Sequence, residues 1–296
     1  MRRLADHAPT LLLLAVTFWA GNFLIGRAVR ADVPPVALAF GRWAGASLLL
    51  APFAARSAWR ERRALRGKWG VTLALSFTGV ATFNTLVYIG LQTTTALNAF
   101  LLQALMPILI LLLGVVAFGE SATARQVVGM TVSLLGAAWV ILEGRASRLV
   151  QLDVALGDAI VLVAVVSYAV YSVLLRQRPA MSGLPFAFVT FVLGTLMLAP
   201  FYFIESTVRP FDPNLAGVAA LVYVMIFPSI ASYLAFNRGV ALIGSSRAGP
   251  YLHLMPILGS LGAVAILGEP FRSHHLVGVA LVALGIALAS RVKRAA

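Results

Sequence analysis

The chain has 296 residues, of which 60% are hydrophobic and 11% are charged, with a mean hydropathy of +0.93 and a net charge of +13. Soluble domains carry about a quarter charged residues, so this composition excludes a soluble globular protein and predicts an all-α integral membrane protein. Cysteine is absent, which excludes disulfides, thiol catalysis and cysteine metal sites.

Apolar stretches of about 18 residues or more recur along the chain, each long enough to cross a hydrocarbon core roughly 30 Å thick. They predict ten membrane spans, at residues 9–29, 36–55, 69–90, 96–118, 125–142, 156–175, 185–205, 216–238, 247–267 and 274–291. The first stretch follows two arginines, as in a signal peptide. It is too long for one, has no small-x-small cleavage site and precedes further spans, so we expect a retained helix.

Basic residues indicate the orientation of these spans. Most Lys and Arg residues fall on the side of the N-terminus, whereas most acidic residues fall on the opposite side. The positive-inside rule therefore predicts that both termini lie in the cytoplasm. The most basic segment, Arg56–Lys68, is expected to lie on anionic lipid, and we expect no nucleic-acid partner.

The chain contains an internal repeat. The sequence LMPIL of Leu105–Leu109 recurs at Leu254–Leu258, and the same offset of 149 residues carries Gly119-Glu120 onto Gly268-Glu269. Apolar composition alone would not align Pro, Gly and Glu together. We therefore predict two five-helix repeats, residues 1–149 and 150–296. Because five is odd, the second repeat is inverted, an arrangement common in secondary transporters with a substrate site near the midplane.

Several segments resemble the drug/metabolite transporter superfamily in its EamA-type ten-helix branch. They are Tyr88–Asn98, Leu105–Leu109 with Gly119-Glu120, Gly239–Ser246, and Leu254–Leu258 with Gly268-Glu269. Gly41-Arg42-Trp43 followed by Leu48–Pro52 is similar to the second helix of that family. The resemblance covers essentially the whole chain. It implies a transporter of the bacterial inner membrane, similar to exporters of aromatic and other neutral amino acids, while other metabolites such as nucleosides or sugars remain the alternative.

Polar and aromatic side chains inside spans are costly and tend to face an interior cavity. The repeat offset relates such residues in pairs and predicts substrate-binding groups near mid-depth, namely Trp19, Asn22, Tyr168 and Tyr171. It likewise predicts an outer and an inner gate, formed by Asn84 with Tyr88 and by Tyr233 with Asn237. The alternative is that these residues only bond neighbouring helices or form interfacial belts, and the belt interpretation is slightly favoured for Tyr88 and Asn237.

Two proline kinks are expected mid-span, at Met106-Pro107 and Met255-Pro256, because proline removes a backbone hydrogen bond and frees a carbonyl. Gln103 and His253 lie within a turn of them and join the substrate-binding candidates. A lone intramembrane histidine is more often a tie between helices than a proton carrier. Arg42, about 10 Å deep at 1.5 Å per residue, is expected to snorkel to the interface, with contact to a substrate carboxylate as the alternative.

Missing motifs narrow the function further. All ten acidic residues fall at span ends or in loops, so the sequence offers no buried carboxylate to pair with a cationic drug. It contains no phosphate-binding loop, no HExxH and no intramembrane aspartate pair. We therefore expect a transporter of a small neutral or zwitterionic molecule, with no ATP hydrolysis, no cofactor and no metal. An intramembrane enzyme and a receptor or scaffold are the disfavoured alternatives.

Overall fold

The computed structural model describes residues 7–150, 155–212, 214–267 and 272–290. Within these ranges the chain forms helices and no strand, as the composition predicts. Eight helices are long and apolar enough to cross a membrane: Ala8–Gly26, Pro35–Leu65, Trp69–Gly90, Asn98–Phe118, Ala124–Ile141, Leu156–Gln177, Gly183–Val208 and Leu215–Ile243. The last two predicted spans contain α13 (Leu254–Leu267) and α14 (Ser273–Ser290), which are not among these eight, so a total of ten crossings stays a prediction.

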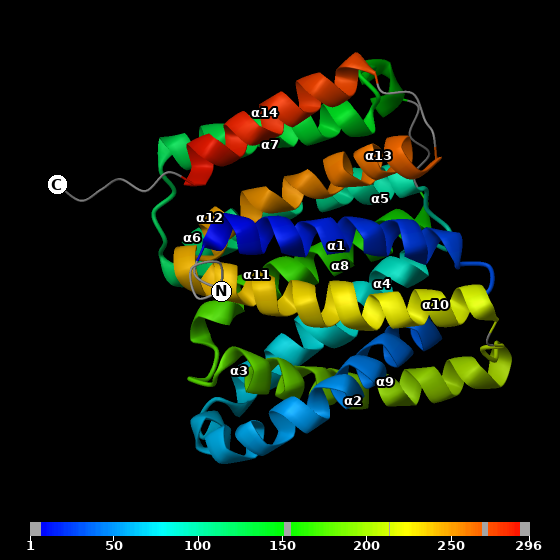
Figure 1. Ribbon diagram of the computed structural model, residues 1–296. Helices are drawn as coiled ribbons and strands as arrows, with labels where there is room; N and C mark the ends of the chain where they lie inside the picture. The colour runs from blue at the N-terminus through cyan, green and yellow to red at the C-terminus, as the bar shows by residue number, and fades with distance from the viewer. Residues whose placement is uncertain (1–6, 151–154, 213, 268–271, 291–296) are drawn as a thin grey trace.

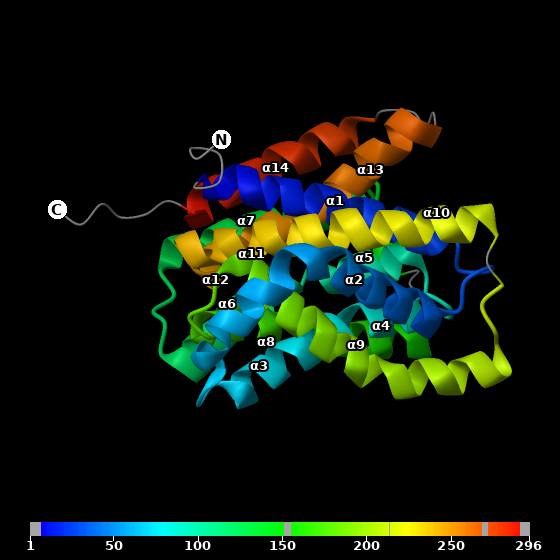
Figure 2. The ribbon, with the colours of Figure 1, turned by 60° about the horizontal axis from the view of Figure 1, so that its bottom comes forward.

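The helices run roughly side by side (Figure 1). Helices α7 (Ala124–Ile141) and α14 lie together along one edge of the bundle, and α2 (Pro35–Glu61) and α9 (Gly183–Val208) pack together at the opposite edge. Between these edges lie α1 (Ala8–Ala28) and α8 (Leu156–Leu174). Figure 2 shows the same bundle turned, with α2, α3 and α9 brought forward.

Two spans share an unusual local structure. One consists of α3 (Trp69–Leu75), a π-helical segment at Ser76–Thr82 and α4 (Phe83–Gly90). The other consists of α10 (Leu215–Val224), a π-helical segment at Met225–Ala231 and α11 (Ser232–Ile243). The repeat offset of 149 residues maps the first residue of one π-helical segment onto the first residue of the other, and the last onto the last. Because π turns shift backbone carbonyls out of the regular helical pattern, they make carbonyl oxygens available to side chains.

Regular α-helical structure is interrupted near both predicted proline kinks. Helix α5 (Ala96–Gln103) ends before Pro107, and α6 (Met106–Phe118) begins after a short turn. In the second half, α12 (Ser245–Ala248) is followed by a 3-10 segment at Gly249–His253 and then by α13. Proline has no N–H to donate to the preceding turn, so the predicted continuous spans 96–118 and 247–267 are each broken near their middle.

Glycines bring α7 and α14 into backbone contact. A Cβ atom on Gly129 would lie 2.6 Å from the Ala289 nitrogen and 2.7 Å from the Gly285 oxygen. One on Gly136 would lie 3.0 Å from the Gly278 oxygen. The repeat offset maps Gly129 onto Gly278 and Gly136 onto Gly285, so the two contacts are equivalent under the repeat. Small residues of this kind allow close approach of membrane helices.

Candidate functional site

A cluster of buried aromatic rings occupies the centre of the bundle. The Trp19 ring of α1 makes edge contacts with Tyr168 of α8, at a centroid distance of 5.7 Å, and with Tyr233 of α11, at 5.8 Å. Tyr168 and Tyr171 lie 5.2 Å apart, and Trp43 of α2 lies 5.1 Å from Tyr233. Tilted and edge-on pairs of this kind are favourable aromatic arrangements. Tyr233, predicted to form a gate, therefore belongs to the central cluster.

A small cavity adjoins this cluster. Its volume is about 10 Å³, which is room for roughly one water molecule. It is lined by Trp19, Asn22, Phe83, Asn84, Gln103, Met106, Tyr168, Leu252 and Met255. Six of these residues are predicted binding residues, and Asn84 is a predicted gate. The other predicted binding residues, Pro107, Tyr171, His253 and Pro256, do not line it. The described conformation is thus closed around the cavity.

Arg42 lies fully buried beside this cavity, with none of its surface exposed. Its Nη1 donates to the Asn22 and Asn84 amide oxygens and to the Tyr88 hydroxyl, at 3.1, 2.9 and 3.0 Å. Its Nε donates to Ser229 Oγ at 2.6 Å, and its Nη2 donates to the Pro228 carbonyl at 3.0 Å. The expected snorkelling is therefore wrong. The guanidinium points inward because neutral oxygens from three other spans, including a carbonyl of the π-helical segment, satisfy its donors there.

The same π-helical carbonyls bind the central aromatics. Trp19 Nε1 also donates to the Pro228 carbonyl, at 2.8 Å. The Gly79 carbonyl, in the π-helical segment of the first half, accepts a hydrogen bond from the Tyr233 hydroxyl. Gly79 and Pro228 are equivalent under the repeat offset. Each π-helical segment therefore anchors an aromatic residue that belongs to the other half of the chain.

Two matched hydrogen bonds each join a tyrosine to an asparagine. The Tyr88 hydroxyl donates to Asn22 Oδ1 at 2.7 Å, and the Tyr171 hydroxyl donates to Asn237 Oδ1 at 2.8 Å. The two residues of each pair lie 66 residues apart in the sequence. The repeat offset maps Asn22 onto Tyr171 and Tyr88 onto Asn237, so tyrosine and asparagine are exchanged between the pairs. Tyr88 and Asn237 are 3% and 6% exposed. The interfacial-belt interpretation of these two residues is therefore wrong, because each is buried between helices.

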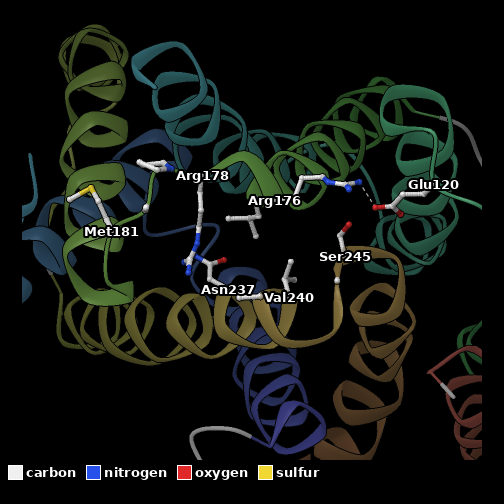
Figure 3. Close-up of a pocket in the computed structure, with 12 residues that line it drawn as sticks. Glu120, Arg176, Arg178, Met181, Asn237, Val240 and Ser245 are labelled. Carbon is white, nitrogen blue, oxygen red and sulfur yellow. Dashed lines mark hydrogen bonds and ion pairs between the residues drawn. The ribbon is translucent and has the colours of Figure 1, made fainter. Parts of the chain in front are cut away.

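A vestibule opens at the end of the bundle that carries loop 175–182 (Figure 3). Its volume is about 450 Å³, and Asn237 of the second tyrosine–asparagine pair lies in its wall. Arg178 points toward Asn237 in Figure 3, and burial lowers the pKa of its guanidinium from the ordinary value. Glu120 pairs with Arg176 and accepts a hydrogen bond from Ser246. Its repeat equivalent, Glu269, lies outside the described residues.

His253 makes two hydrogen bonds to neighbouring segments. Its Nε2 lies 2.8 Å from the Ala104 carbonyl oxygen, and its Nδ1 lies 2.7 Å from Ser133 Oγ. A carbonyl can only accept, so Nε2 carries the proton and Nδ1 accepts from the serine hydroxyl. Ala104 and His253 are themselves related by the repeat offset. These contacts are those of a tie between the two halves, and the ring does not line the cavity.

Comparisons with known proteins agree with this architecture. The model of the EamA-like transporter family matches the chain twice, over residues 8–142 and 155–291. A solved crystal structure with 21% sequence identity superposes with a TM-score of 0.76, covering 96% of this chain and 97% of that one, which establishes similarity of fold.

Curated relatives include transporters from several bacteria. The "uncharacterized transporter YyaM" of Bacillus subtilis is 29% identical over 75% of this chain and 73% of its own length. A "probable terminal-alkyne amino-acid exporter" of Streptantibioticus cattleyicolor is 29% identical over 95% of this chain and 92% of its own. A "probable amino-acid metabolite efflux pump" of Salmonella typhimurium is 25% identical over 93% and 92%. With both halves matched by the family model, the chain is a multi-pass membrane protein that belongs to the EamA-like transporter family.

Proposed function

We propose that this protein is a secondary transporter of the bacterial inner membrane that exports small neutral or zwitterionic metabolites, chiefly aromatic and other hydrophobic amino acids. The observation that carries the proposal is the central cavity between two matched tyrosine–asparagine bonds. The Tyr88–Asn22 bond, with Arg42, adjoins the cavity through Asn22, which lines it, and the Tyr171–Asn237 bond adjoins the vestibule through Asn237, which lines that space. We assign the first bond to one gate and the second bond to the other. A site with a removable barrier on each side is what alternating access requires.

The proposed mechanism depends on the two halves being inverted copies, 1–149 and 150–296, with both termini in the cytoplasm. The equivalent π-helical segments, the exchanged tyrosine–asparagine pairs and the reciprocal glycine contacts of α7 and α14 support this relation. In such a pair the two halves exchange conformations, so that the vestibule closes at Asn237 as a matching opening forms beside Asn22. In the described conformation the central cavity is closed, and the vestibule lies on the side of loop 175–182, the predicted cytoplasmic side.

The substrate class rests on two supports. The cavity is closed to about 10 Å³ in the described conformation, and its lining of aromatic, amide and methionine side chains has the chemistry to contact a molecule with an apolar ring or chain and a polar head once it opens. Two relatives over nearly the whole chain carry names of amino-acid exporters or efflux pumps. We therefore propose amino acids with apolar side chains ahead of nucleosides or sugars.

Counterflow tests the proposal directly. Purified protein in liposomes preloaded with unlabelled phenylalanine should accumulate external radiolabelled phenylalanine transiently, without ATP or an imposed ion gradient. Nucleosides and sugars should compete poorly. The labelled phenylalanine recovered from the liposomes should be chemically unchanged, whereas an enzyme would have converted it. Liposomes without protein are the control. Counterflow of uridine or glucose in place of phenylalanine would replace the amino-acid assignment, and no counterflow of any solute would refute transport.

Topology provides a second, independent prediction. A reporter active only in the periplasm should be silent when fused after Arg63, between α2 and α3, and active when fused after Arg148, between α7 and α8. The excess of basic residues on one side of the spans is the physical reason. Alkaline phosphatase activity of the two fusions at equal membrane levels is the measurement. The reverse pattern would place the vestibule on the periplasmic side and contradict the proposed orientation.

A further inference from the structure

Arg42 is a buried cation without a carboxylate partner. The ion pairs of Arg148 with Glu143 and of Arg176 with Glu120 lie elsewhere in the protein and are partly exposed. The oxygens that accept from Arg42 belong to amides, hydroxyls and one carbonyl, all of them neutral. These neutral acceptors and the Trp43 ring, 4.7 Å from the guanidinium carbon, replace the lost hydration, yet they supply no full negative charge in a low-dielectric interior. The surroundings of Arg42 therefore favour an additional negative charge.

The same arginine fixes the orientation of two cavity-lining amides. Its Nη1 donates to the side-chain oxygens of both Asn22 and Asn84. Since a guanidinium has donors and no acceptor, these oxygens must face Arg42. The NH₂ group of Asn84 is then turned away from the arginine; it lies near the Tyr233 hydroxyl, but its nitrogen is buried and completes no hydrogen bond there. Arg42 thus presents an amide donor at the cavity that Asn84 lines.

Two further donors at the same cavity also lack partners. The described residues contain five buried side-chain nitrogen or oxygen atoms without a hydrogen bond, and three of them belong to residues that line this cavity. They are Asn84 Nδ2, Gln103 Nε2 and Tyr168 Oη. Buried polar atoms are nearly always hydrogen-bonded in folded proteins, so three unpaired donors around one cavity indicate a missing acceptor. No carboxylate is among the lining residues that the structure describes.

We propose that this cavity is the subsite for the substrate carboxylate, and that Arg42 is the positioning residue that keeps it positive. A carboxylate offers about four acceptor positions, enough for two amide NH₂ groups and a tyrosine hydroxyl. The inference rests on the proposed transport function and adds which end of the substrate is recognised. The class it defines is monocarboxylic acids with an apolar side chain, with or without an α-amino group, because no described acid lines the cavity to hold an ammonium group.

Substrate analogues that keep only one charged end test this subsite. In counterflow of labelled phenylalanine, phenylpyruvate should compete within about threefold of unlabelled phenylalanine, since it keeps the carboxylate. Phenylalaninamide and phenethylamine should compete at least tenfold more weakly. Thermal stabilisation of the purified protein by each compound gives a second readout that does not depend on transport. Stabilisation or competition by phenethylamine equal to that by phenylpyruvate would overturn the proposal, whereas absence of counterflow with retained phenylpyruvate stabilisation would refute only the proposed function.

Variants separate the positioning role from folding. Asn84→Asp adds a negative charge next to Arg42 with almost no change of shape, and it should weaken phenylpyruvate binding at least tenfold while the protein stays folded. Arg42→Lys keeps the charge and should preserve the preference for the acid over the amine. Asn214→Asp is the matched control, because Asn214 caps α10 by accepting from the Gly217 N–H at 2.7 Å, and aspartate caps as well. Normal phenylpyruvate binding by a folded Asn84→Asp protein would refute the role of Arg42.

Discussion

Replacing Gly129 or Gly285 with alanine is expected to lower the unfolding temperature and the amount of folded protein in the membrane, whereas the same change at Gly70 should do neither. A Cβ atom on Gly129 would lie 2.6 Å from the Ala289 nitrogen, and one on Gly285 would lie 2.5 Å from the Gly129 oxygen. These neighbours are backbone atoms, so α7 and α14 must move apart. Forced separation of this kind costs about 1–3 kcal/mol.

Gly70 is the matched control for this experiment. It lies in α3, and nothing lies within 4 Å of the position that its Cβ would take. Alanine is favoured over glycine inside a helix by about 0.5–1 kcal/mol, so Gly70→Ala should be neutral or slightly stabilising. Size-exclusion chromatography after heating detergent-solubilised protein would measure all three variants. Equal melting of the Gly129→Ala, Gly285→Ala and Gly70→Ala proteins would mean that α7 and α14 are not in backbone contact.

The internal sequence repeat predicts which distant residues occupy equivalent places in the structure, which the positions of the spans alone do not. The single offset that aligns LMPIL in the two halves also relates the two π-helical segments, the two tyrosine–asparagine bonds and the glycine contacts of α7 with α14. Equivalent positions occupy equivalent environments even where the residue types are exchanged, as with Tyr88 and Asn237. This is why pairing residues by the offset selected Trp19 and Tyr168, whose rings are in contact.

Local backbone structure was less accessible from the sequence. A π-helical segment and a regular helix have the same apolar composition, and what distinguishes the segment at Met225–Ala231 is that Trp19 and Arg42 bind the Pro228 carbonyl. Those partners lie 209 and 186 residues away. Proline marked the approximate position of the changes in the fourth and ninth spans, yet it did not reveal the turn after Gln103 or the 3-10 segment at Gly249–His253. The hydrogen bonds to the Pro228 carbonyl come from distant spans, which single-helix patterns do not contain.

The direction of Arg42 shows the same limit. At its depth, an arginine can extend to the interface or inward, and the sequence near Arg42 is compatible with either. The choice follows from Asn22, Asn84 and Tyr88, which lie 20, 42 and 46 residues away. One signal was nevertheless present, because these three polar residues and Arg42 all belong to the first half. An intramembrane arginine in the same half as several intramembrane acceptors favours an inward network over snorkelling.

Trp19→Ala and Tyr168→Ala should each lower the apparent affinity for phenylalanine while leaving folded protein in the membrane. Both residues line the central cavity, and their rings contact each other at a centroid distance of 5.7 Å. An aromatic contact contributes about 0.5–1.5 kcal/mol beyond area burial, which corresponds to a loss of roughly two- to twelvefold at 1.4 kcal/mol per tenfold change. Leucine, which has no ring to stack, should lose less than phenylalanine does.

Two further variants decide between a substrate wall and a packing role. Trp59→Ala removes a tryptophan that is 67% exposed on α2, so it should leave the affinities for both substrates unchanged. Trp19→Phe keeps a ring but loses the hydrogen bond to the Pro228 carbonyl, and it should keep most of the preference for phenylalanine over leucine. Half-saturation concentrations in counterflow, together with melting temperatures, are the measurements. If Trp19 and Tyr168 only pack helices, their alanine variants will melt earlier and lose transport of leucine and phenylalanine equally, because a loosened bundle has no reason to distinguish a ring from an aliphatic chain.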